Sequence, residues 1–275
     1  MHNIELFLRV AKEASLLGGL VLKEFYRKEN NKVMEKGEKD IYSLADKLSE
    51  ESIREHIQKH LPDHLVVGEE GGGSSDGDYV WYIDPLDGTK NYIAGFPIFG
   101  TSVGLLYKGK PLVGAVYLPA FDSLYWAAEG LGAYKNGKII RVRQKEKLKE
   151  CYVAYGYPSR AKRDLNAYWN IFREIFDKVG AMRRPGAAAI DLCLLAEGVF
   201  DGLLEFELNP WDVVSGTLIA KEAGAKVALS KGFSLGTDVY AGNEICFPQV
   251  CQERRCLDVK ALFTSFKKAW LSSWK

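Results

Sequence analysis

Apolar residues recur at helical spacing in the first part of the chain. They mark one face of a long amphipathic helix at Ile4, Phe7, Leu8, Ala11, Ala14, Gly18, Val21, Leu22 and Phe25. A polar segment from Arg27 to Asp40 follows. A second helix is predicted from Ser43 to about His60, because Pro62 stops it.

The middle of the chain reads as short apolar strands separated by turn residues. The predicted strands are Thr101–Tyr107, Leu112–Tyr117, Ser123–Ala128 and Ile139–Val142. The turn dipeptides between them are Lys108-Gly109, Pro119-Ala120 and Asn136-Gly137. This pattern predicts an antiparallel meander with hairpin turns.

After Lys147 the pattern changes to strands that alternate with helices. The predicted order is strand Tyr152–Gly156, helix Asn166–Val179, strand Ala181–Arg184, helix Gly186–Glu197, strand Gly202–Leu204, helix Asp212–Ala223 and strand Lys226–Leu229. Such alternation indicates an α/β unit with a partly parallel sheet. We therefore predict two halves, an α+β half over 1–147 and an α/β half over 148–275.

Composition is that of an ordinary globular protein. Of 275 residues, 47% are hydrophobic and 27% are charged, and the formal net charge of +1 argues against a nucleic-acid binder that relies on bulk charge. The longest early apolar stretch, from Leu16 to Leu22, is too short to span a membrane. We expect a cytoplasmic protein with no membrane partner.

The candidate chemistry begins where an apolar run ends in aspartates. Tyr79–Ile83 leads into Asp84-Pro85-Leu86-Asp87-Gly88-Thr89, and then into Lys90-Asn91-Tyr92. Carboxylate oxygens are the ligands that Mg²⁺ prefers, and backbone N–H groups at a helix start attract a phosphate. The alternative is an ordinary strand-to-turn junction, because Asp-Gly is a common turn signal.

Two further carboxylate clusters lie at the edges of predicted elements. Gly68-Glu69-Glu70 ends an upstream apolar run, and Asn209-Pro210-Trp211-Asp212 opens a predicted helix. Asp212 stands where an N-cap would stand, and capping is its alternative role. The three clusters could converge on one metal site.

Taken together, these motifs resemble the inositol monophosphatase family. That family belongs to the Mg²⁺-dependent, lithium-sensitive phosphomonoesterases, together with fructose-1,6-bisphosphatases and phosphoadenosine-phosphate phosphatases. The resemblance runs from the first helix to about Gly242, with Glu222-Ala223-Gly224 as a further match. It implies a layered αβαβα sandwich of mixed α+β and α/β type, a site between the two halves, and a homodimer.

The resemblance also implies roles for individual residues. Glu69, Asp84 and the Leu86 carbonyl would hold one Mg²⁺, and Asp84, Asp87 and Asp212 would hold a second. Thr89, Asp46 and Glu69 would be the catalytic residues, with Thr89 paired to Asp46 to orient the attacking water. The alternative for Asp46 is a helix cap or a solvated position. The backbone N–H groups of Gly88 and Thr89 would receive phosphate oxygens.

A count of charges predicts two or three Mg²⁺ per site. The four carboxylates balance the charge of two Mg²⁺, which leaves no positive charge for a phosphate dianion. The phosphate therefore needs either a third Mg²⁺, near Glu69 and Glu70, or a lysine such as Lys36 or Lys90.

The residues expected on the substrate side match the family pattern less completely than the metal-site motifs do. Arg183-Arg184-Pro185-Gly186-Ala187-Ala188-Ala189 resembles a family segment in which Ala187 is usually a hydroxyl residue, and Ala188 would contact substrate. Glu205 matches an acidic residue that binds inositol hydroxyls, with a surface carboxylate as its alternative. Arg183 could face a second phosphate or simply be solvated. Inositol-1-phosphate is the leading substrate, and fructose-1,6-bisphosphate, alone or in a dual specificity, is the runner-up.

The tail from Gln249 departs from the family pattern. Basic positions Arg254, Arg255, Lys260, Lys267 and Lys268 lie beside an apolar stripe of Val259, Leu262, Phe263, Phe266, Trp270 and Trp274. Packing of a terminal helix on the core or on a sister subunit is favoured. A partner of the transcription machinery is the less favoured alternative.

Overall fold

The computed structural model describes residues 3–29, 31, 33–37, 40–157 and 165–251. The basic and apolar positions predicted for the tail after Cys251 lie outside this range. Among the described residues, no helix is both long enough and apolar enough to cross a bilayer.

The first sheet has seven strands in the order β3-β4-β5-β6-β7-β8-β9. Its strands are β3 (Leu65–Gly68), β4 (Tyr79–Asp87), β5 (Gly100–Tyr107), β6 (Lys110–Leu118), β7 (Ser123–Ala128), β8 (Ala133–Lys135) and β9 (Lys138–Ile140). β3 is parallel to β4, and every later pair is antiparallel. The predicted meander is confirmed, with β8 as an additional short strand.

The second sheet has five strands in the order β11-β10-β12-β14-β13. They are β10 (Tyr152–Tyr155), β11 (Ala181–Arg183), β12 (Gly202–Leu208), β13 (Lys226–Leu229) and β14 (Thr237–Gly242). β10 is parallel to β11 and β12, whereas β14 is antiparallel to β12 and β13. The predicted partly parallel sheet is confirmed. The division into 1–147 and 148–275 stays a prediction.

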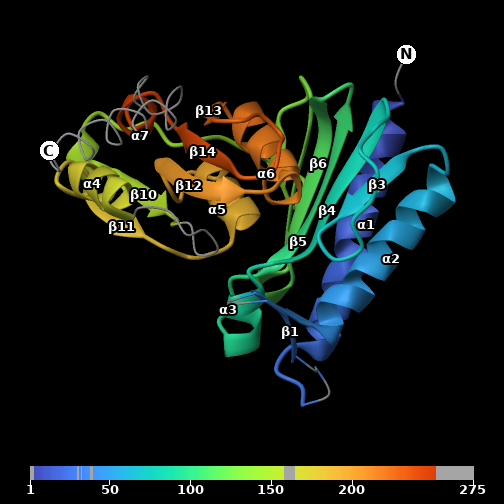
Figure 1. The fold of residues 1–275 in the computed structure, drawn as a ribbon. Helices are drawn as coiled ribbons and strands as arrows, with labels where there is room; N and C mark the ends of the chain where they lie inside the picture. Colours follow the sequence, from blue (N-terminus) through green and yellow to red (C-terminus); the bar gives the residue numbers. More distant parts are fainter. Residues whose placement is uncertain (1–2, 30, 32, 38–39, 158–164, 252–275) are drawn as a thin grey trace, which may run out of the picture.

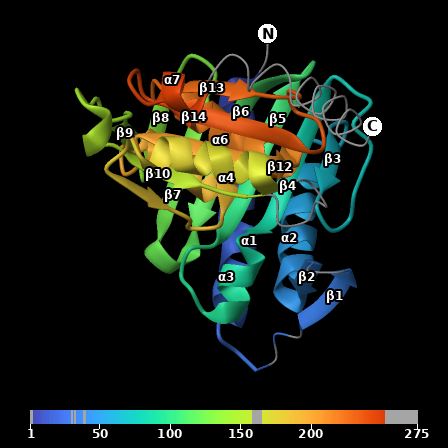
Figure 2. The same ribbon diagram turned by 60° about the vertical axis from the view of Figure 1, so that its left-hand side comes forward.

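Apart from the short α3, the helices form three layers around the two sheets (Figures 1 and 2). They are α1 (Ile4–Phe25), α2 (Leu44–His60), α3 (Thr89–Ala94), α4 (Leu165–Phe176), α5 (Ala188–Ala196), α6 (Pro210–Glu222) and α7 (Phe247–Val250). α1 and α2 cover one face of the seven-stranded sheet, and α5 and α6 lie between the sheets. α4 and α7 pack on the far face of the five-stranded sheet. The predicted αβαβα sandwich is confirmed.

Apolar side chains join each pair of layers. Val10 and Ile53 pack with Trp81 in one buried cluster. Ile190 and Leu218 from the central helices share a second cluster with residues of both sheets. Because each central helix is covered on both sides, α5 is buried almost all round and carries no amphipathic stripe.

One small ribbon was absent from the sequence prediction. β1 (Val33–Gly37) pairs antiparallel with β2 (Asp40–Ser43) inside the segment that reads as polar. Lysine and glutamate dominate this stretch of sequence, so period-two alternation does not stand out there. Two short 3₁₀ turns, at Pro119–Phe121 and Leu148–Glu150, complete the described elements.

Candidate active site

The end of β4 delivers two buried aspartates to one pocket. Asp84 is 2% exposed and Asp87 is 6% exposed. The pairing of β4 with β5 shifts register between these two residues, where Pro85 can donate no backbone hydrogen bond. The Oδ1 atom of Asp84 accepts from the N–H of Leu86 at 2.9 Å. This irregularity lets both carboxylates line a single pocket of about 190 Å³.

Carboxylates from three different elements meet in this pocket. Glu69 follows β3, Asp84 lies in β4, and Asp212 lies in the first turn of α6. One ligand oxygen from each lies within 4.8 Å of the other two. The three clusters that are separated in the sequence are thus brought together by the packing of α6 across the seven-stranded sheet.

The three carboxylates repel one another. Burial raises the pKa of Asp84 well above its usual range, and the negative charges of Glu69, Asp87 and Asp212 raise this pKa further. A hard divalent cation bound here would relieve both effects, because it replaces lost hydration and cancels the repulsion. The donor set therefore fits Mg²⁺.

Asp87 lines the same pocket but is also bonded to a helix start. Its Oδ2 accepts from the N–H of Ile190, in the first turn of α5, at 3.1 Å. Ala187, at the N-cap of α5, has no side-chain oxygen, so the carboxylate from β4 serves one of the helix's unpaired N–H groups. Burial raises the pKa of Asp87 to about 7, although the hydrogen bonds from α5 oppose the shift.

Thr89 and Asp46 form a polar pair beside the pocket. Thr89 opens α3, and its Oγ1 lies 3.0 Å from the carbonyl oxygen of Leu86 and 3.4 Å from Oδ1 of Asp46. Gly88, the N-cap of α3, has φ of 86° and ψ of 36°, a left-handed conformation that favours glycine. The turn thereby directs Thr89 toward both acceptors.

The carboxyl of Asp46 is buried and partly satisfied by its own helix. Its Oδ2 accepts from the N–H of Ser43 at 2.7 Å and from the Ser43 hydroxyl at 2.6 Å. Burial raises the pKa of Asp46 to about 6, and the bonds from Ser43 oppose this shift. Asp46 does cap α2, as its alternative role supposed, but from the third helical position and while facing Thr89.

Asp212 also differs from its expected position. The N-cap of α6 is Asn209, and Asp212 is the third helical residue, whose Oδ2 accepts from the N–H of Asn209 at 2.7 Å. The helix begins earlier than predicted because Pro210 is well suited to a first helical position. Asp212 therefore does take part in capping α6, its alternative role, but from the third helical position, because the N-cap is Asn209.

Glu50 was missed by the sequence reasoning. This α2 residue is 4% exposed, and its two carboxylate oxygens accept from the N–H groups of Glu70 and Gly71, each at 2.8 Å. Arg54 pairs with the same carboxylate at 2.8 Å. Glu50 therefore holds the turn that presents Glu69. Its only signal in the sequence is the four-residue spacing to Arg54.

The substrate side of the pocket combines a carboxyl group, from Glu205, with a guanidinium cation, from Arg184. Glu205 on β12 is 8% exposed and lines the pocket with Ala188. Burial raises the pKa of Glu205 to about 8, with Arg184 lowering it and Asp87 raising it. The guanidinium of Arg184 lies 4.0 Å from the centre of the Tyr157 ring, and both residues line the pocket.

Arg183 does not lie where its predicted role requires. It is exposed, and its Nη1 donates to the carbonyl of Met182 at 2.9 Å. Arg184, one residue later, lines the pocket instead. Successive residues of an extended segment point in opposite directions, so a shift of one position reverses the side. Lys90 lines the pocket as well, whereas the side chain of Lys36 lies outside the described part of the chain.

Sequence comparisons give matches across nearly the whole chain. The model of a family described as "Inositol monophosphatase family" matches residues 3–261. A protein of Aquifex aeolicus named fructose-1,6-bisphosphatase/inositol-1-monophosphatase is 57% identical over 249 residues, which are 89% of this chain and 93% of the relative. A Pseudomonas aeruginosa protein named Nus factor SuhB is 36% identical over 253 residues, covering 89% of this chain and 92% of the relative.

The fold comparison points the same way. The solved structure of inositol monophosphatase from Anabaena (Nostoc) sp. PCC 7120 matches with a TM-score of 0.77 at 34% sequence identity. The match covers 90% of this chain and 95% of that chain.

Proposed function

The chain belongs to the inositol monophosphatase family, and from this membership and the geometry of the pocket we propose that it is a Mg²⁺-dependent phosphomonoesterase. The observation that carries the proposal is the meeting of Glu69, Asp84 and Asp212 within 4.8 Å, from three separate elements. Carboxylates gathered in this way repel one another, and a bound cation would remove this repulsion.

The proposed metal ligands are Glu69, Asp84, Asp87, Asp212 and the carbonyl oxygen of Leu86. Two or three Mg²⁺ held there would make a bound water acidic and would stabilise the charge that develops on the leaving oxygen. The protein's own part is to hold these ligands rigidly. Asp87 is fixed by Ile190, and the turn that carries Glu69 is fixed by Glu50.

Thr89 and Asp46 are proposed to manage the proton of the attacking water. The hydroxyl of Thr89 can accept from a water and donate to Asp46, whose Oδ1 lies 3.4 Å away. A carboxyl with a pKa of about 6 is ionised at neutral pH and can still take up a proton briefly. The backbone N–H groups of Gly88 and Thr89 are proposed to receive phosphate oxygens.

Inositol-1-phosphate is the proposed substrate, with fructose-1,6-bisphosphate as the second candidate. A Glu205 carboxyl with a pKa of about 8 carries a proton for much of the time at neutral pH, so it can donate to or accept from polyol hydroxyls. The second candidate is supported by the name of the Aquifex aeolicus relative and by Arg184, a cation at the pocket suited to a second phosphate.

The test is phosphate release from both esters in Mg²⁺, with Asp87→Asn as the inactive variant. Asparagine can still accept from Ile190, so α5 keeps its partner while a metal-binding charge is lost. We expect hydrolysis that depends on Mg²⁺ and falls by orders of magnitude in the variant. Release that is unchanged in Asp87→Asn would contradict the proposed site.

A binding role in transcription is kept as a candidate of another class. It is supported by relatives named Nus factor SuhB at 35–36% identity. The tail positions that suggested this role lie outside the described residues. Absence of Mg²⁺-dependent release from either ester, together with retention of transcription proteins by the full-length chain, would favour this role over catalysis.

A further inference from the structure

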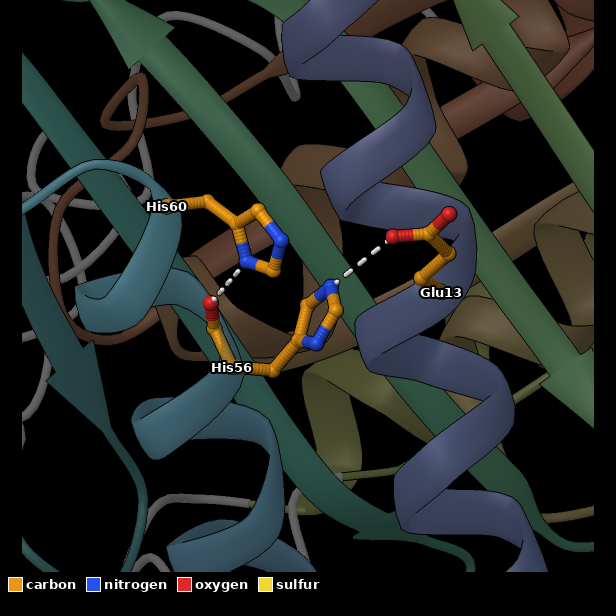
Figure 3. Close-up of side chains that lie close together, drawn as sticks. All are labelled: Glu13, His56 and His60. Atoms are coloured by element: carbon orange, nitrogen blue, oxygen red, sulfur yellow. Dashed lines mark hydrogen bonds and ion pairs between the residues drawn. The ribbon is translucent and has the colours of Figure 1, made fainter.

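Two histidines and a glutamate face one another on the outer helical layer, away from the proposed active site. Glu13 lies on α1, and His56 and His60 lie one turn apart on α2 (Figure 3). None of the three lines the catalytic pocket. The histidines follow Asp46 by ten and fourteen residues on α2, which corresponds to roughly 15–21 Å along the helix axis.

The three side chains present their ligand atoms to a common point. Nε2 of His56 lies 3.1 Å from Oε2 of Glu13. One ligand atom from each of the three residues lies within 4.8 Å of the other two. Ligands around a tetrahedral ion with bonds of about 2.0–2.1 Å are roughly 3.3 Å apart. Small side-chain movements would bring the three ligand atoms from their present separations, all within 4.8 Å, to this spacing.

A hydrogen bond already fixes one imidazole for metal binding. Nδ1 of His60 lies 2.9 Å from the carbonyl oxygen of His56, and a carbonyl can only accept. Nδ1 therefore carries the proton, and in the neutral ring Nε2 keeps its lone pair. Histidine ligands in metal sites are commonly oriented by this kind of bond from the other ring nitrogen to a backbone carbonyl.

The charges and exposure of the cluster are also suitable. The Glu13 side chain is 44% exposed and that of His56 is 15% exposed, so an ion has access and a water can complete the set. Burial lowers the pKa of His56, and His60 and Lys59 lower it further while Glu13 opposes them. This direction favours the neutral imidazole, the form that binds a metal ion.

We propose that Glu13, His56 and His60 form a binding site for a divalent transition-metal ion such as Zn²⁺. Two imidazole nitrogens and one carboxylate oxygen suit this class of ion, whereas Mg²⁺ prefers oxygen ligands alone. The ion would link α1 to the last turn of α2 and so stabilise the helical layer. This site is independent of the proposed phosphatase function.

The experiment measures Zn²⁺ binding by titration calorimetry on the full-length protein in excess Mg²⁺. The variants are His60→Gln, His56→Gln and Asp84→Asn, with Glu55→Gln as a matched control on an exposed position of the same helix. We expect each histidine variant to lose at least about tenfold in Zn²⁺ affinity, since even indirect metal partners contribute this much. Glu55→Gln and Asp84→Asn should keep the affinity of the wild type.

Two results would overturn the proposal. One is unchanged Zn²⁺ affinity in both histidine variants. The other is loss of Zn²⁺ binding in Asp84→Asn, because the ion would then sit in the catalytic pocket. His60 is exposed in the last turn of α2, so His60→Gln is expected to fold even if the half-buried His56 is less tolerant. A rise in melting temperature on adding Zn²⁺, absent in His60→Gln, provides a second readout.

Discussion

The hydroxyl of Thr89 has one proton and two acceptors within reach. The Leu86 carbonyl is the nearer at 3.0 Å, and Asp46 is 3.4 Å away. If Leu86 binds a cation, its carbonyl is a poorer acceptor, and the proton of Thr89 is expected to turn toward Asp46. We therefore expect the metal-free and the metal-bound geometry of this pair to differ by a rotation of the Thr89 hydroxyl.

We predict that Thr89→Ala loses about 10²-fold or more in kcat, the usual contribution of a positioned proton-transfer group. Thr89→Ser keeps the hydroxyl and should retain most of the activity. Phosphate release at saturating Mg²⁺ measures both. Equal losses in the two variants would show that the methyl group, and not the hydroxyl, matters at this position.

Arg184 provides a second prediction at the scale of one residue. If fructose-1,6-bisphosphate binds, Arg184→Gln should lower kcat/KM for it by about 10- to 100-fold, because a hydrogen bond to a charged group contributes about 1.5–3 kcal/mol. Hydrolysis of inositol-1-phosphate should change much less. Arg183→Gln is the matched control, since Arg183 is exposed and does not line the pocket.

The contrast between these two arginines shows what sequence alone could predict of the site. Glu69, Asp84 and Asp212 follow from local motifs, because each ends or begins a recognisable element. Arg184 could not be separated from Arg183, since the direction of a side chain depends on how its segment enters the pocket. The bond from Asp87 to Ile190 joins residues 103 positions apart, and no local pattern predicts it.

At the scale of elements, the turn after β3 depends on one residue of α2. Glu50 accepts from two backbone N–H groups of this turn. We predict that Glu50→Ala raises the Mg²⁺ concentration for half-maximal activity about 10- to 100-fold, the usual effect of losing a group that orients a metal ligand. Glu51→Ala, exposed on the same helix, is the control. An unchanged Mg²⁺ dependence in Glu50→Ala would mean that Glu69 needs no such support.

The elements themselves were predictable where one periodicity dominates. The predicted apolar face from Ile4 to Phe25 spans the whole of α1, and the strand boundaries of the meander were found to within about two residues. β14 was missed although all its residues are buried. Its run Thr237-Asp238-Val239-Tyr240-Ala241-Gly242 mixes polar and small residues, and its burial comes from the helices that cover both faces of the sheet.

At the scale of the whole molecule, the pocket depends on how closely the layers pack. α6 carries Asp212, and it approaches the seven-stranded sheet where Gly114 has no side chain. A Cβ atom at this glycine would lie 2.8 Å from Cα of Ser215, too close for any real side chain. The hydroxyls of Ser102 and Ser215 bond across the same contact at 2.5 Å. The carboxylate set is thus assembled by the tertiary fold.

The buried carboxyl groups make the free energy of unfolding depend on pH. Burial raises the pKa of Asp46 to about 6, of Asp87 to about 7 and of Glu205 to about 8. The folded protein therefore holds protons that the unfolded chain releases as pH rises above about 4. The metal-free protein should lose stability between about pH 4 and pH 8. His56 and His64, whose pKa values are lowered, act oppositely, but only below about pH 6.5.

Magnesium should reverse this loss, and by more at high pH than at low pH. If Mg²⁺ binds the ionised carboxylates of the folded state as proposed, a hundredfold excess over Kd adds about 2.7 kcal/mol to the free energy of unfolding. For a chain of this size that corresponds to roughly 5 °C or more in melting temperature. We expect this Mg²⁺-induced rise at pH 8, almost none at pH 5, and a much smaller rise in Asp84→Asn. Only the buried carboxylates, whose pKa values are raised, hold protons at pH 5 that compete with the cation. An equal rise at both pH values would therefore mean that Mg²⁺ binds other groups.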